Sequence, residues 1–427
     1  MKLTLIHGKW FNSWEALGLG YLASYIRKHE PNCEITFWQG CFDSDDAIIA
    51  DASTADIVAF SNTSPTVTHS VNLGRAIKKE NPNVWTVTGG YHPSAVGRKA
   101  LVENAIDQVV IGEGEDALLR IMRGDRRPVI TGRMMKFDEL EWPDRTLLKN
   151  ERCIDVAEEL TGVRITSVHS HRGCVFRCKF CADGAVKVLF PGTSWKHDAL
   201  IRYRDPEDIV DEMAYIAKKY NLGLIKKAAP TWNLSRAWVH EFCKAKIRKG
   251  VEVPFYPAIH AGIMDDETAQ LMREAGCVQA ALGIESGSDK ILREVGKGTT
   301  KKSIRRCVTA LQKAGIAVRG YLIFGMPEED WGTVRETIEF VDSLNLAEAG
   351  ATILAPYPGS VYFNEEEHGH ILWDQVDEYQ NDFWHSNYLS NAELKEAQAL
   401  FADKFQSTLC WHQKEVMKTR EAQQIAA

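Results

Sequence analysis

The sequence predicts an α/β protein with a doubly wound parallel sheet, then a partial parallel (β/α)6 barrel, then a helical C-terminal tail. Two observations support this: short apolar runs alternate with amphipathic stretches in two separate series, and Gly-containing joints separate them. A length of 427 residues fits two or three domains. The composition, 44% hydrophobic and 26% charged, is enough to bury large cores and excludes a disordered chain.

The first series of alternating runs predicts a domain over residues 1–124. Its candidate strands are Leu3–Ile6, Glu34–Trp38, Ile57–Ser61, Val84–Gly89 and Gln108–Ile111. A helical pattern over 68–80 lies between two of them, and a last helix is expected to begin after Gly112. Residues 125–163 contain two prolines and many charges, which predicts a linker.

The second series predicts a domain over residues 164–363. Its candidate strands are Ile165–Ser170, Gly223–Lys227, Pro254–His260, Val278–Gly283, Ala317–Phe324 and Ala351–Ala355. Within 206–220 the apolar residues fall on one helical face. Six strand–helix units are too few for an eight-fold barrel, so we expect an open, partial one. Residues 364–427 are expected to form a C-terminal cap, helical over 391–422.

Charge and hydropathy exclude several classes of protein. The net charge of −7 indicates neither a nucleic-acid surface nor an anionic-membrane surface. No apolar run approaches the roughly 20 residues that span a bilayer, and the apolar start is too short for a signal peptide. Ten cysteines are too few for a disulfide scaffold. We therefore expect a cytoplasmic protein with a small-molecule substrate.

The most specific motif is a C-x3-C-x2-C loop directly after the first strand of the second domain. Its cysteines are Cys174, Cys178 and Cys181. A [4Fe–4S] cluster normally takes four Cys ligands, so three local ones leave one iron open. A zinc site completed by His169 or His171 is one alternative, and unbound thiols are another. The other seven cysteines are expected to be core residues.

With an aromatic residue, Phe180, before the last cysteine, this loop resembles that of radical S-adenosylmethionine (SAM) enzymes. Three later segments resemble the SAM-contacting turns of that family, in the same order: Gly283–Ser288, Tyr321–Pro327 and Ala355–Ser360. The resemblance covers roughly 164–363. It implies a cluster whose open iron chelates SAM, cofactor contacts from Phe180, Glu285 and Ser286, and an electron donor such as flavodoxin or ferredoxin.

The N-terminal domain resembles the cobalamin-binding domain that precedes many radical SAM cores. The segments that carry this resemblance are Leu17–Ala23, Ser61–Thr66, Gly89–Pro93 and Gly112–Glu115. The resemblance implies that the small residues Thr63, Ser64, Gly89 and Gly90 admit the nucleotide tail of cobalamin. His92 is a candidate to lie near the corrin or the substrate, and the more common alternative is a loop histidine satisfied by its own hydrogen bonds. No Asp-x-His-x-x-Gly motif is present, so a histidine-ligated cobalt is not indicated. Alternatively, the glycines serve turns only and the domain is empty, so cobalamin binding stays open.

Two segments, one after the second and one after the third barrel strand, depart from the family pattern. Lys226 and Lys227 stand where an acidic pair is common, and His260 stands where an arginine is common. At the mouth of the active site the lysines would favour an anionic substrate, and His260 is a weak candidate acid or base. The alternatives are surface charge for the lysines and a strand-end hydrogen bond for the histidine.

Three functions remain open from the sequence. The favoured one is a transferase that delivers the 3-amino-3-carboxypropyl group of SAM to a soft nucleophile, since the chain loosely resembles the arsinothricin-biosynthesis radical SAM proteins, which transfer that group to trivalent arsenic. Cys33, Cys41 and Cys410 are conceivable thiols for such a metalloid, although ordinary core or surface cysteines are expected. The alternatives are a cobalamin-dependent radical SAM C-methyltransferase and a non-catalytic cobalamin or cluster sensor.

Overall fold

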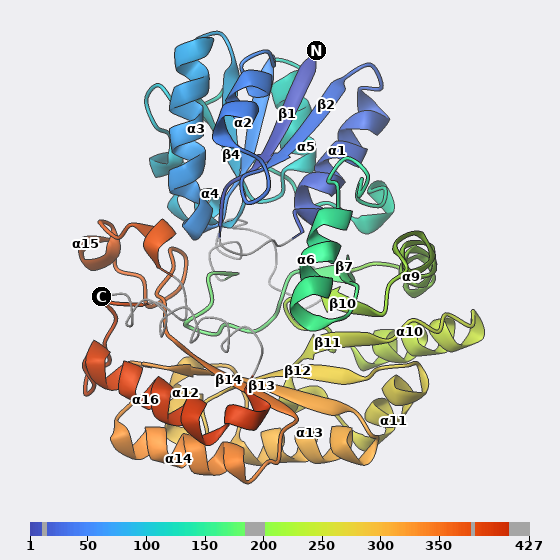
Figure 1. The fold of residues 1–427 in the computed structure, drawn as a ribbon, viewed down its shortest axis with the longest axis vertical. Helices are drawn as coiled ribbons and strands as arrows, with labels where there is room; N and C mark the ends of the chain where they lie inside the picture. The colour runs from blue at the N-terminus through green and yellow to red at the C-terminus, as the bar shows by residue number, and fades with distance from the viewer. Residues whose placement is uncertain (11–14, 184–200, 377–380, 410–427) are drawn as a thin grey trace. The chain divides into compact units, whose positions relative to one another are not determined.

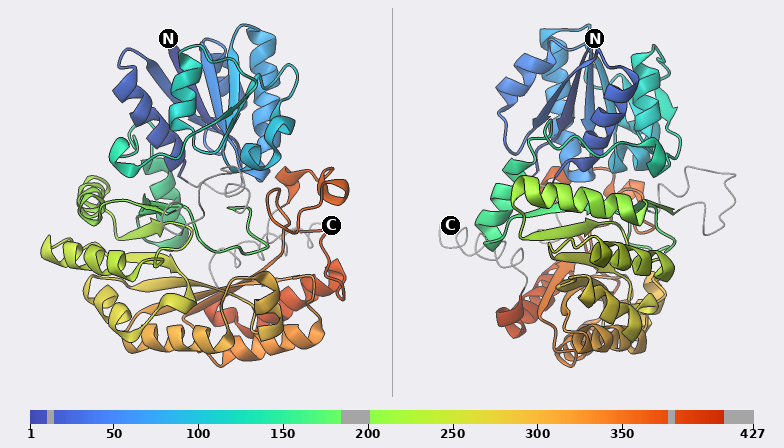
Figure 2. Two further views of the ribbon diagram at one scale, coloured as in Figure 1. Left: turned by 180° about the vertical axis from the view of Figure 1, so that it is seen from behind. Right: turned by 90° about the vertical axis from the view of Figure 1, so that its right-hand side faces the viewer.

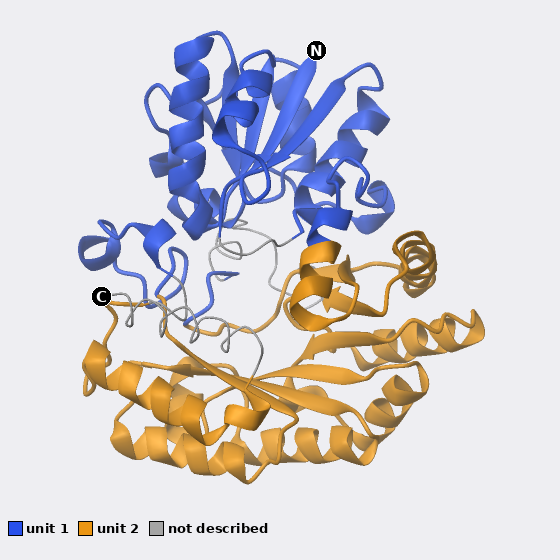
Figure 3. Ribbon diagram, in the orientation of Figure 1, with its two compact units in different colours: residues 1–153, 180–194, 356–377 blue, residues 154–179, 195–355, 378–427 orange. Residues whose placement is uncertain are grey.

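The computed structural model describes residues 1–10, 15–183, 201–376 and 381–409 (Figure 1). The chain divides into two compact units, which Figure 3 shows in blue and orange. The first unit comprises residues 1–153, 180–194 and 356–377. The second comprises residues 154–179, 195–355 and 378–427.

The first unit is built on a six-stranded sheet in the order β2-β1-β3-β4-β5-β6, and every neighbouring pair of strands is parallel. Order 2-1-3 places a topological switch point between β1 and β3, where ligands of doubly wound folds bind. The strands are β1 (Lys2–His7), β2 (Glu34–Gln39), β3 (Ile57–Ser61), β4 (Trp85–Gly89), β5 (Gln108–Ile111) and β6 (Val129–Thr131).

Helices cover both faces of this sheet. Leu3 and Leu5 belong to a core with α1 and α5, whereas Val58 and Phe60 belong to a second core with α2 and α3. Apolar residues on both faces of the same strands explain the nearly continuous apolar runs in the sequence. The helices and 3-10 turns of this unit are α1 (Leu17–His29), α2 (Asp45–Ala52), η1 (Ser64–Thr66), α3 (Val67–Glu80), α4 (Tyr91–Val96), η2 (Gly97–Ala100), α5 (Glu115–Met122), η3 (Phe137–Glu139), α15 (Glu365–His368) and η5 (Trp373–Gln375).

The second unit contains a six-stranded parallel sheet in the order β14-β13-β12-β11-β10-β7. This confirms the predicted partial barrel. Its strands are β7 (Ile165–His169), β10 (Leu224–Ala228), β11 (Phe255–Ile259), β12 (Gln279–Glu285), β13 (Ala317–Phe324) and β14 (Glu348–Ile353). A two-stranded antiparallel ribbon, β8 (His171–Arg172) with β9 (Arg202–Tyr203), follows β7.

Helices lie between successive strands of this sheet in the chain, and Figure 2 shows them packed along it. Several helices begin with a side-chain cap: Asp205 accepts the N–H of Glu207 at the start of α9, and Asp330 accepts the N–H of Thr333 at the start of α14. The helices and 3-10 turns are α9 (Pro206–Tyr220), α10 (Arg236–Arg248), η4 (Ala261–Ile263), α11 (Asp266–Glu274), α12 (Asp289–Val295), α13 (Lys301–Lys313), α14 (Trp331–Asp342), α16 (Asn391–Lys404) and η6 (Gln406–Thr408).

The structure defines the elements of the predicted linker and of the predicted C-terminal cap. The predicted linker 125–163 contains β6 and helix α6 (Glu151–Thr161). In the predicted cap, α16 packs on β14, and Gln398 Nε2 donates to Ala351 O at 2.9 Å. An open parallel sheet exposes unpaired backbone groups at its edge, and α16 covers one such edge here. The helix predicted over 391–422 ends at Lys404 in the structure and is followed by the 3-10 turn η6, and its predicted part beyond residue 409 lies outside the described residues. The predicted domain boundaries stay a prediction.

No helix in the described part of the chain is both long enough and apolar enough to cross a bilayer.

Candidate active site

The three motif cysteines lie on the loop that follows β7 and β8. Cys174 is buried, and Cys178 and Cys181 are partly exposed. Within the motif, the Lys179 N–H donates to Val295 O at 3.0 Å, so this part of the loop lies at the end of α12. Over the ranges that the structure describes, no three His, Cys, Asp or Glu side chains are grouped as metal ligands. The cluster ligands, and the zinc alternative, therefore stay predictions.

A buried ion-pair network supports the chain just before the cysteines. Arg204 is 2% exposed, donates to His169 O at 3.1 Å, and pairs with Glu212 and Asp208 at 2.5 Å each. Its backbone N–H donates to Ser170 O at 3.0 Å. Glu212 is also buried, so the charges on Arg204 and Glu212 compensate each other away from water. The network ties α9 to the carboxyl end of β7, where the motif loop begins.

The fourth barrel strand ends in an irregular turn that carries Glu285. The ladder between β12 and β13 shifts register between Gly283 and Glu285, and Glu285 has a φ of +62°, which a residue with a side chain rarely adopts. Its carboxylate is buried and forms an ion pair with Lys297, whose ammonium also donates to Gly283 O at 2.7 Å. Glu285 is therefore charge-compensated before any ligand binds.

Ser286 and Phe180 were predicted to contact the cofactor together with Glu285. Ser286 is fully buried, and its hydroxyl bonds Thr337 Oγ1 at 3.1 Å and accepts the Ser288 N–H at 3.1 Å. These bonds shape the turn after β12. Phe180 is partly buried. A role of either side chain in SAM binding stays a prediction.

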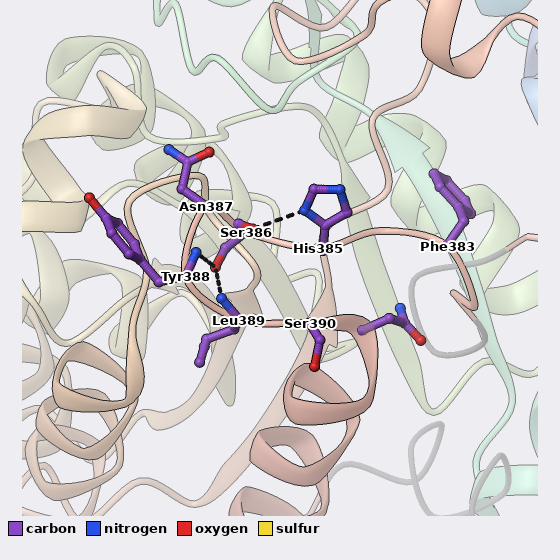
Figure 4. A pocket seen from close by; sticks show the side chains of 8 residues that line it. Phe383, His385, Ser386, Asn387, Tyr388, Leu389 and Ser390 are labelled. Atoms are coloured by element: carbon purple, nitrogen blue, oxygen red, sulfur yellow. Dashed lines mark hydrogen bonds between the residues drawn. The ribbon is translucent and has the colours of Figure 1, made fainter.

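The turn after β13 is held by a loop from the C-terminal region. Trp384 Nε1 donates to Gly325 O at 2.6 Å, Asn387 N–H donates to Pro327 O at 2.9 Å, and Ser386 Oγ donates to Glu329 O at 2.8 Å. Figure 4 shows this loop, in which the Ser386 hydroxyl also accepts the N–H groups of Tyr388 and Leu389. A shallow pocket is lined by residues 383 and 385–391.

Glu329 is the most perturbed acid of this region, and the sequence analysis did not single it out. It is 0% exposed, its carboxylate accepts the Gly325 N–H at 2.5 Å, and its Oε1 has no hydrogen-bond partner among the described residues. Burial raises its pKa to about 8. The sequence Glu328-Glu329-Asp330 did not indicate that Glu329 is buried, because consecutive acidic residues are typical of a solvent-exposed helix start.

The structure separates the two lysines that were predicted to line the mouth of the site. Lys227 is 1% exposed and lies between sheet and helices, with Nζ 2.6 Å from Met213 Sδ of α9 and 4.3 Å from the Phe242 ring centre of α10. The prediction that it faces the mouth, and the surface alternative, are both wrong for Lys227. Burial depresses the pKa of its ammonium strongly. Lys226 is partly exposed and points to the opposite face, because side chains alternate along a strand.

His260 follows β11, as the strand-end alternative expected. It is 3% exposed, its Nδ1 accepts the Gly262 N–H at 3.1 Å, and its Nε2 lies 3.0 Å from Lys297 O. Burial lowers its pKa to about 4, so the ring is neutral at pH 7. Both ring nitrogens are occupied within the protein, which leaves no ring nitrogen for proton transfer to a substrate. The geometry therefore supports the hydrogen-bonding alternative over an acid or base role.

The carboxyl edge of the first sheet is organised by one buried amide, Asn62. Its Oδ1 accepts from Thr66 Oγ1 at 3.1 Å and Ser70 Oγ at 2.7 Å, and its Nδ2 donates to Thr88 Oγ1 at 3.0 Å. The sequence analysis included Asn62 in the segment Ser61–Thr66 but assigned it no role. These bonds link the ends of β3 and β4 with the start of α3.

The predicted cobalamin contacts lie around this amide. Thr63 is exposed, and Ser64 is buried and lies 3.0 Å from His92 Nδ1. Burial lowers the pKa of His92 to about 4. Gly90 has a φ of +105°, and a Cβ there would lie 2.6 Å from Asn62 O, so only glycine fits. A Cβ on Gly89 would make only ordinary contact with Val110, at 3.5 Å.

The residues at both edges fit the cofactors that the sequence resemblance implies. On the first sheet, His7 ends β1 beside the switch point, and its buried Nδ1 has no hydrogen-bond partner in the described chain. An amide or phosphate of a ligand would satisfy that atom. On the second sheet, three cysteines lie on one short loop, and an odd thiol set suits a cluster with one open iron.

The other candidate thiols gain no support. Cys33 and Cys41 are partly exposed, and burial raises the pKa of both, which disfavours the thiolate form that binds soft metals. Cys410 lies outside the described residues.

Comparison with known families assigns each of the two parallel sheets to a known protein domain. Residues 168–341 match the radical SAM superfamily, and residues 4–122 match the B12-binding domain. An uncharacterized methyltransferase of Pyrococcus horikoshii is 27% identical over 81% of this chain and 76% of its own length. The anaerobic magnesium-protoporphyrin IX monomethyl ester cyclase of Rubrivivax gelatinosus is 26% identical, with coverages of 90% and 70%. The bacteriochlorophyllide d C-12(1)-methyltransferase of Chlorobaculum tepidum is 24% identical, with coverages of 79% and 72%.

Solved structures show the same fold. The radical SAM methyltransferase TsrM from Kitasatospora setae aligns with a TM-score of 0.69 and 15% identity over 100% of both chains. The cobalamin-dependent SAM radical enzyme OxsB aligns with a TM-score of 0.62 and 17% identity, over 79% of this chain and 51% of its own. The two domains together imply a [4Fe–4S] cluster, SAM and cobalamin as cofactors. This chain is thus a radical SAM enzyme with an N-terminal cobalamin-binding domain.

Proposed function

We propose that the protein is a cobalamin-dependent radical SAM methyltransferase that acts on a carbon atom of a small molecule. The observation that carries the proposal is the presence of a B12-binding domain and a radical SAM domain in one chain. Relatives named as methyltransferases support it. The sequence analysis favoured aminocarboxypropyl transfer to arsenic and kept methyl transfer as an alternative. The comparisons favour methyl transfer and offer no support for transfer to arsenic.

The chain's own residues have distinct tasks in this proposal. Cys174, Cys178 and Cys181 would hold the cluster, and Glu285 would accept a hydrogen bond from SAM while Lys297 compensates its charge. When bound, the cluster and SAM supply one-electron cleavage of a sulfonium C–S bond, and cobalamin supplies methyl-group transfer. Lys226, on the strand face opposite the buried Lys227, would pair with an anionic group of the substrate.

The proposal also includes an electron donor and a cellular compartment for the enzyme. Reduction of a SAM-ligated cluster needs a strongly reducing donor, because cluster potentials extend to about −700 mV. A small acidic or iron–sulfur electron carrier, flavodoxin or ferredoxin, would serve. Such donors and reduced thiols are cytoplasmic, so we propose that the enzyme works there.

Anaerobic reconstitution followed by product analysis tests the proposal. Protein reconstituted with the cluster, and with or without cobalamin, would be incubated with a reductant, methyl-labelled SAM and a metabolite extract. We expect S-adenosylhomocysteine, 5′-deoxyadenosine and an extract metabolite that carries the labelled methyl group. The labelled metabolite should form only when cobalamin is present. Methylthioadenosine as the main product would instead indicate aminocarboxypropyl transfer and contradict the proposal.

A second candidate follows from the cyclase relative, which covers 90% of this chain. A radical enzyme of that kind would form 5′-deoxyadenosine without moving a methyl group from SAM to the substrate. In the same assay it would yield an altered metabolite that carries no label.

A cysteine comparison tests the cluster ligands separately. Cys178→Ala should lose most bound iron and the visible absorption of the cluster, because each thiolate is one of only three protein ligands. Cys33→Ala, a partly exposed cysteine outside the motif, should keep the wild-type iron content. Equal iron in both variants would refute the ligand assignment.

A further inference from the structure

A side-chain stack joins the motif loop to the end of β11. Phe176 lies between Cys174 and Cys178 in sequence, and its ring centre is 3.9 Å from that of His260, with the ring planes inclined by only 11°. His260 is buried, so the contact is sheltered from water. The aromatic residue in the middle of the motif therefore rests on the first residue after a barrel strand.

The position of the His260 ring is fixed from several sides. Its backbone N–H donates to Asn233 Oδ1 at 2.8 Å, and its carbonyl accepts from Asn233 Nδ2 at 3.1 Å. Nδ1 faces a backbone N–H, that of Gly262, so we assign the ring proton to Nε2, which then donates to Lys297 O. With both nitrogens bonded, the ring cannot rotate without breaking hydrogen bonds.

Lys297 extends this chain of contacts to Glu285. Its carbonyl holds the His260 ring, and its ammonium pairs with the Glu285 carboxylate and donates to Gly283 O at 2.7 Å. Phe176, His260, Lys297 and Glu285 thus form one continuous path inside the second unit.

We propose that His260 is a positioning residue that sets the motif loop relative to the Lys297–Glu285 pair. The proposal rests on the proposed function, in which the loop carries the cluster and Glu285 contacts SAM. Aromatic stacking and a buried hydrogen bond each contribute modestly, so removing His260 should weaken SAM binding about tenfold rather than abolish it. An arginine, which is common at this position in the family pattern, would stack with Phe176 but would offer no acceptor to the Gly262 N–H.

The test uses reconstituted holoprotein and measures iron content, the electron paramagnetic resonance (EPR) spectrum of the reduced cluster, and the SAM concentration that half-converts that spectrum. His260→Ala should keep the wild-type iron content, alter the spectrum, and require about tenfold more SAM. His260→Phe retains the stack but not the bond to Lys297 O. It should show the wild-type spectrum without SAM and still require more SAM.

Further variants keep the proposal falsifiable if His260→Ala does not fold. Phe176→Leu removes the stack from the loop side and should alter the spectrum in the same way. Where His260→Ala does fold, combining it with Phe176→Leu should change the spectrum little further, because both substitutions remove the same stacking contact. His240→Ala is the matched control, since His240 lies on α10 and bonds Thr268 at 3.1 Å; it should match wild type.

The outcomes separate this inference from the proposed function. Wild-type protein that takes up no cluster, or whose spectrum does not respond to SAM, would overturn both. Wild-type protein that responds, with both His260→Ala and Phe176→Leu indistinguishable from it, would overturn the positioning role alone.

Discussion

Replacement of Glu329 by glutamine tests how burial controls the turn after β13. The side chain is fully buried, one oxygen accepts the Gly325 N–H, and Oε1 has no partner among the described residues. Burial raises its pKa to about 8, against 4.5 for an ordinary glutamate. Glutamine keeps the accepting oxygen and the size, and it cannot ionise.

The sign and size of the effect follow from proton linkage. Because the folded-state pKa lies above the unfolded value, the folded protein holds a proton that the unfolded chain has released between pH 4.5 and 8. The free energy of unfolding therefore falls by about 1.4 kcal/mol per pH unit in that window, or about 5 kcal/mol in total. Glutamine avoids this loss but buries an amide N–H group without a partner, at about 1–3 kcal/mol. Glu329→Gln should thus be more stable than wild type by about 2 kcal/mol or more at pH 8, and less stable at pH 5.

Thermal unfolding of both proteins between pH 5 and 8.5 checks this. The melting temperature of the variant should cross that of wild type as the pH rises. Glu339→Gln, an exposed position on α14, serves as the control and should show no crossing. A constant difference between Glu329→Gln and wild type over the whole range would refute the assignment of a protonated, buried carboxyl group.

Three further predictions concern other parts of the chain. Lys227→Met should raise the melting temperature near pH 7, because it removes a buried amine that has no carboxylate contact among the described residues. The stabilisation, about 1–4 kcal/mol, should shrink as the pH approaches 10, because the lysine of the unfolded chain then loses its proton, whereas Lys226→Met should show no such trend. Gly90→Ala should destabilise the first unit and reduce hydroxocobalamin uptake measured by absorbance, while Gly89→Ala binds as wild type; equal uptake by both would contradict the close approach at position 90. Trp384→Phe should lower stability by about 1 kcal/mol through loss of one indole hydrogen bond, and an unchanged melting temperature would count against that bond.

Much of this protein could be predicted from local patterns. The two series of apolar runs predicted both parallel sheets, because the periodicity of a strand or a helix can be recognised from a few consecutive residues. The C-x3-C-x2-C spacing pointed to the radical SAM family for the same reason, because one loop carries all three thiols. β6 escaped notice because it has only three residues and directly follows Pro128, and α6 because many of its residues are charged.

What only the tertiary structure decided is the environment of each polar side chain. Lys226 and Lys227 are neighbours in sequence, yet one is partly exposed and the other lies beside Met213 and Phe242. Glu329 reads as one of three consecutive acidic residues, and its carboxyl is buried beneath a turn that Trp384 holds from 59 positions away in sequence. The sequence by itself determined the two sheets and the place of the three-cysteine loop, because these follow from spacing along the chain. Burial, charge and proton affinity depend instead on residues brought together from distant segments, and no local pattern records which ones they are.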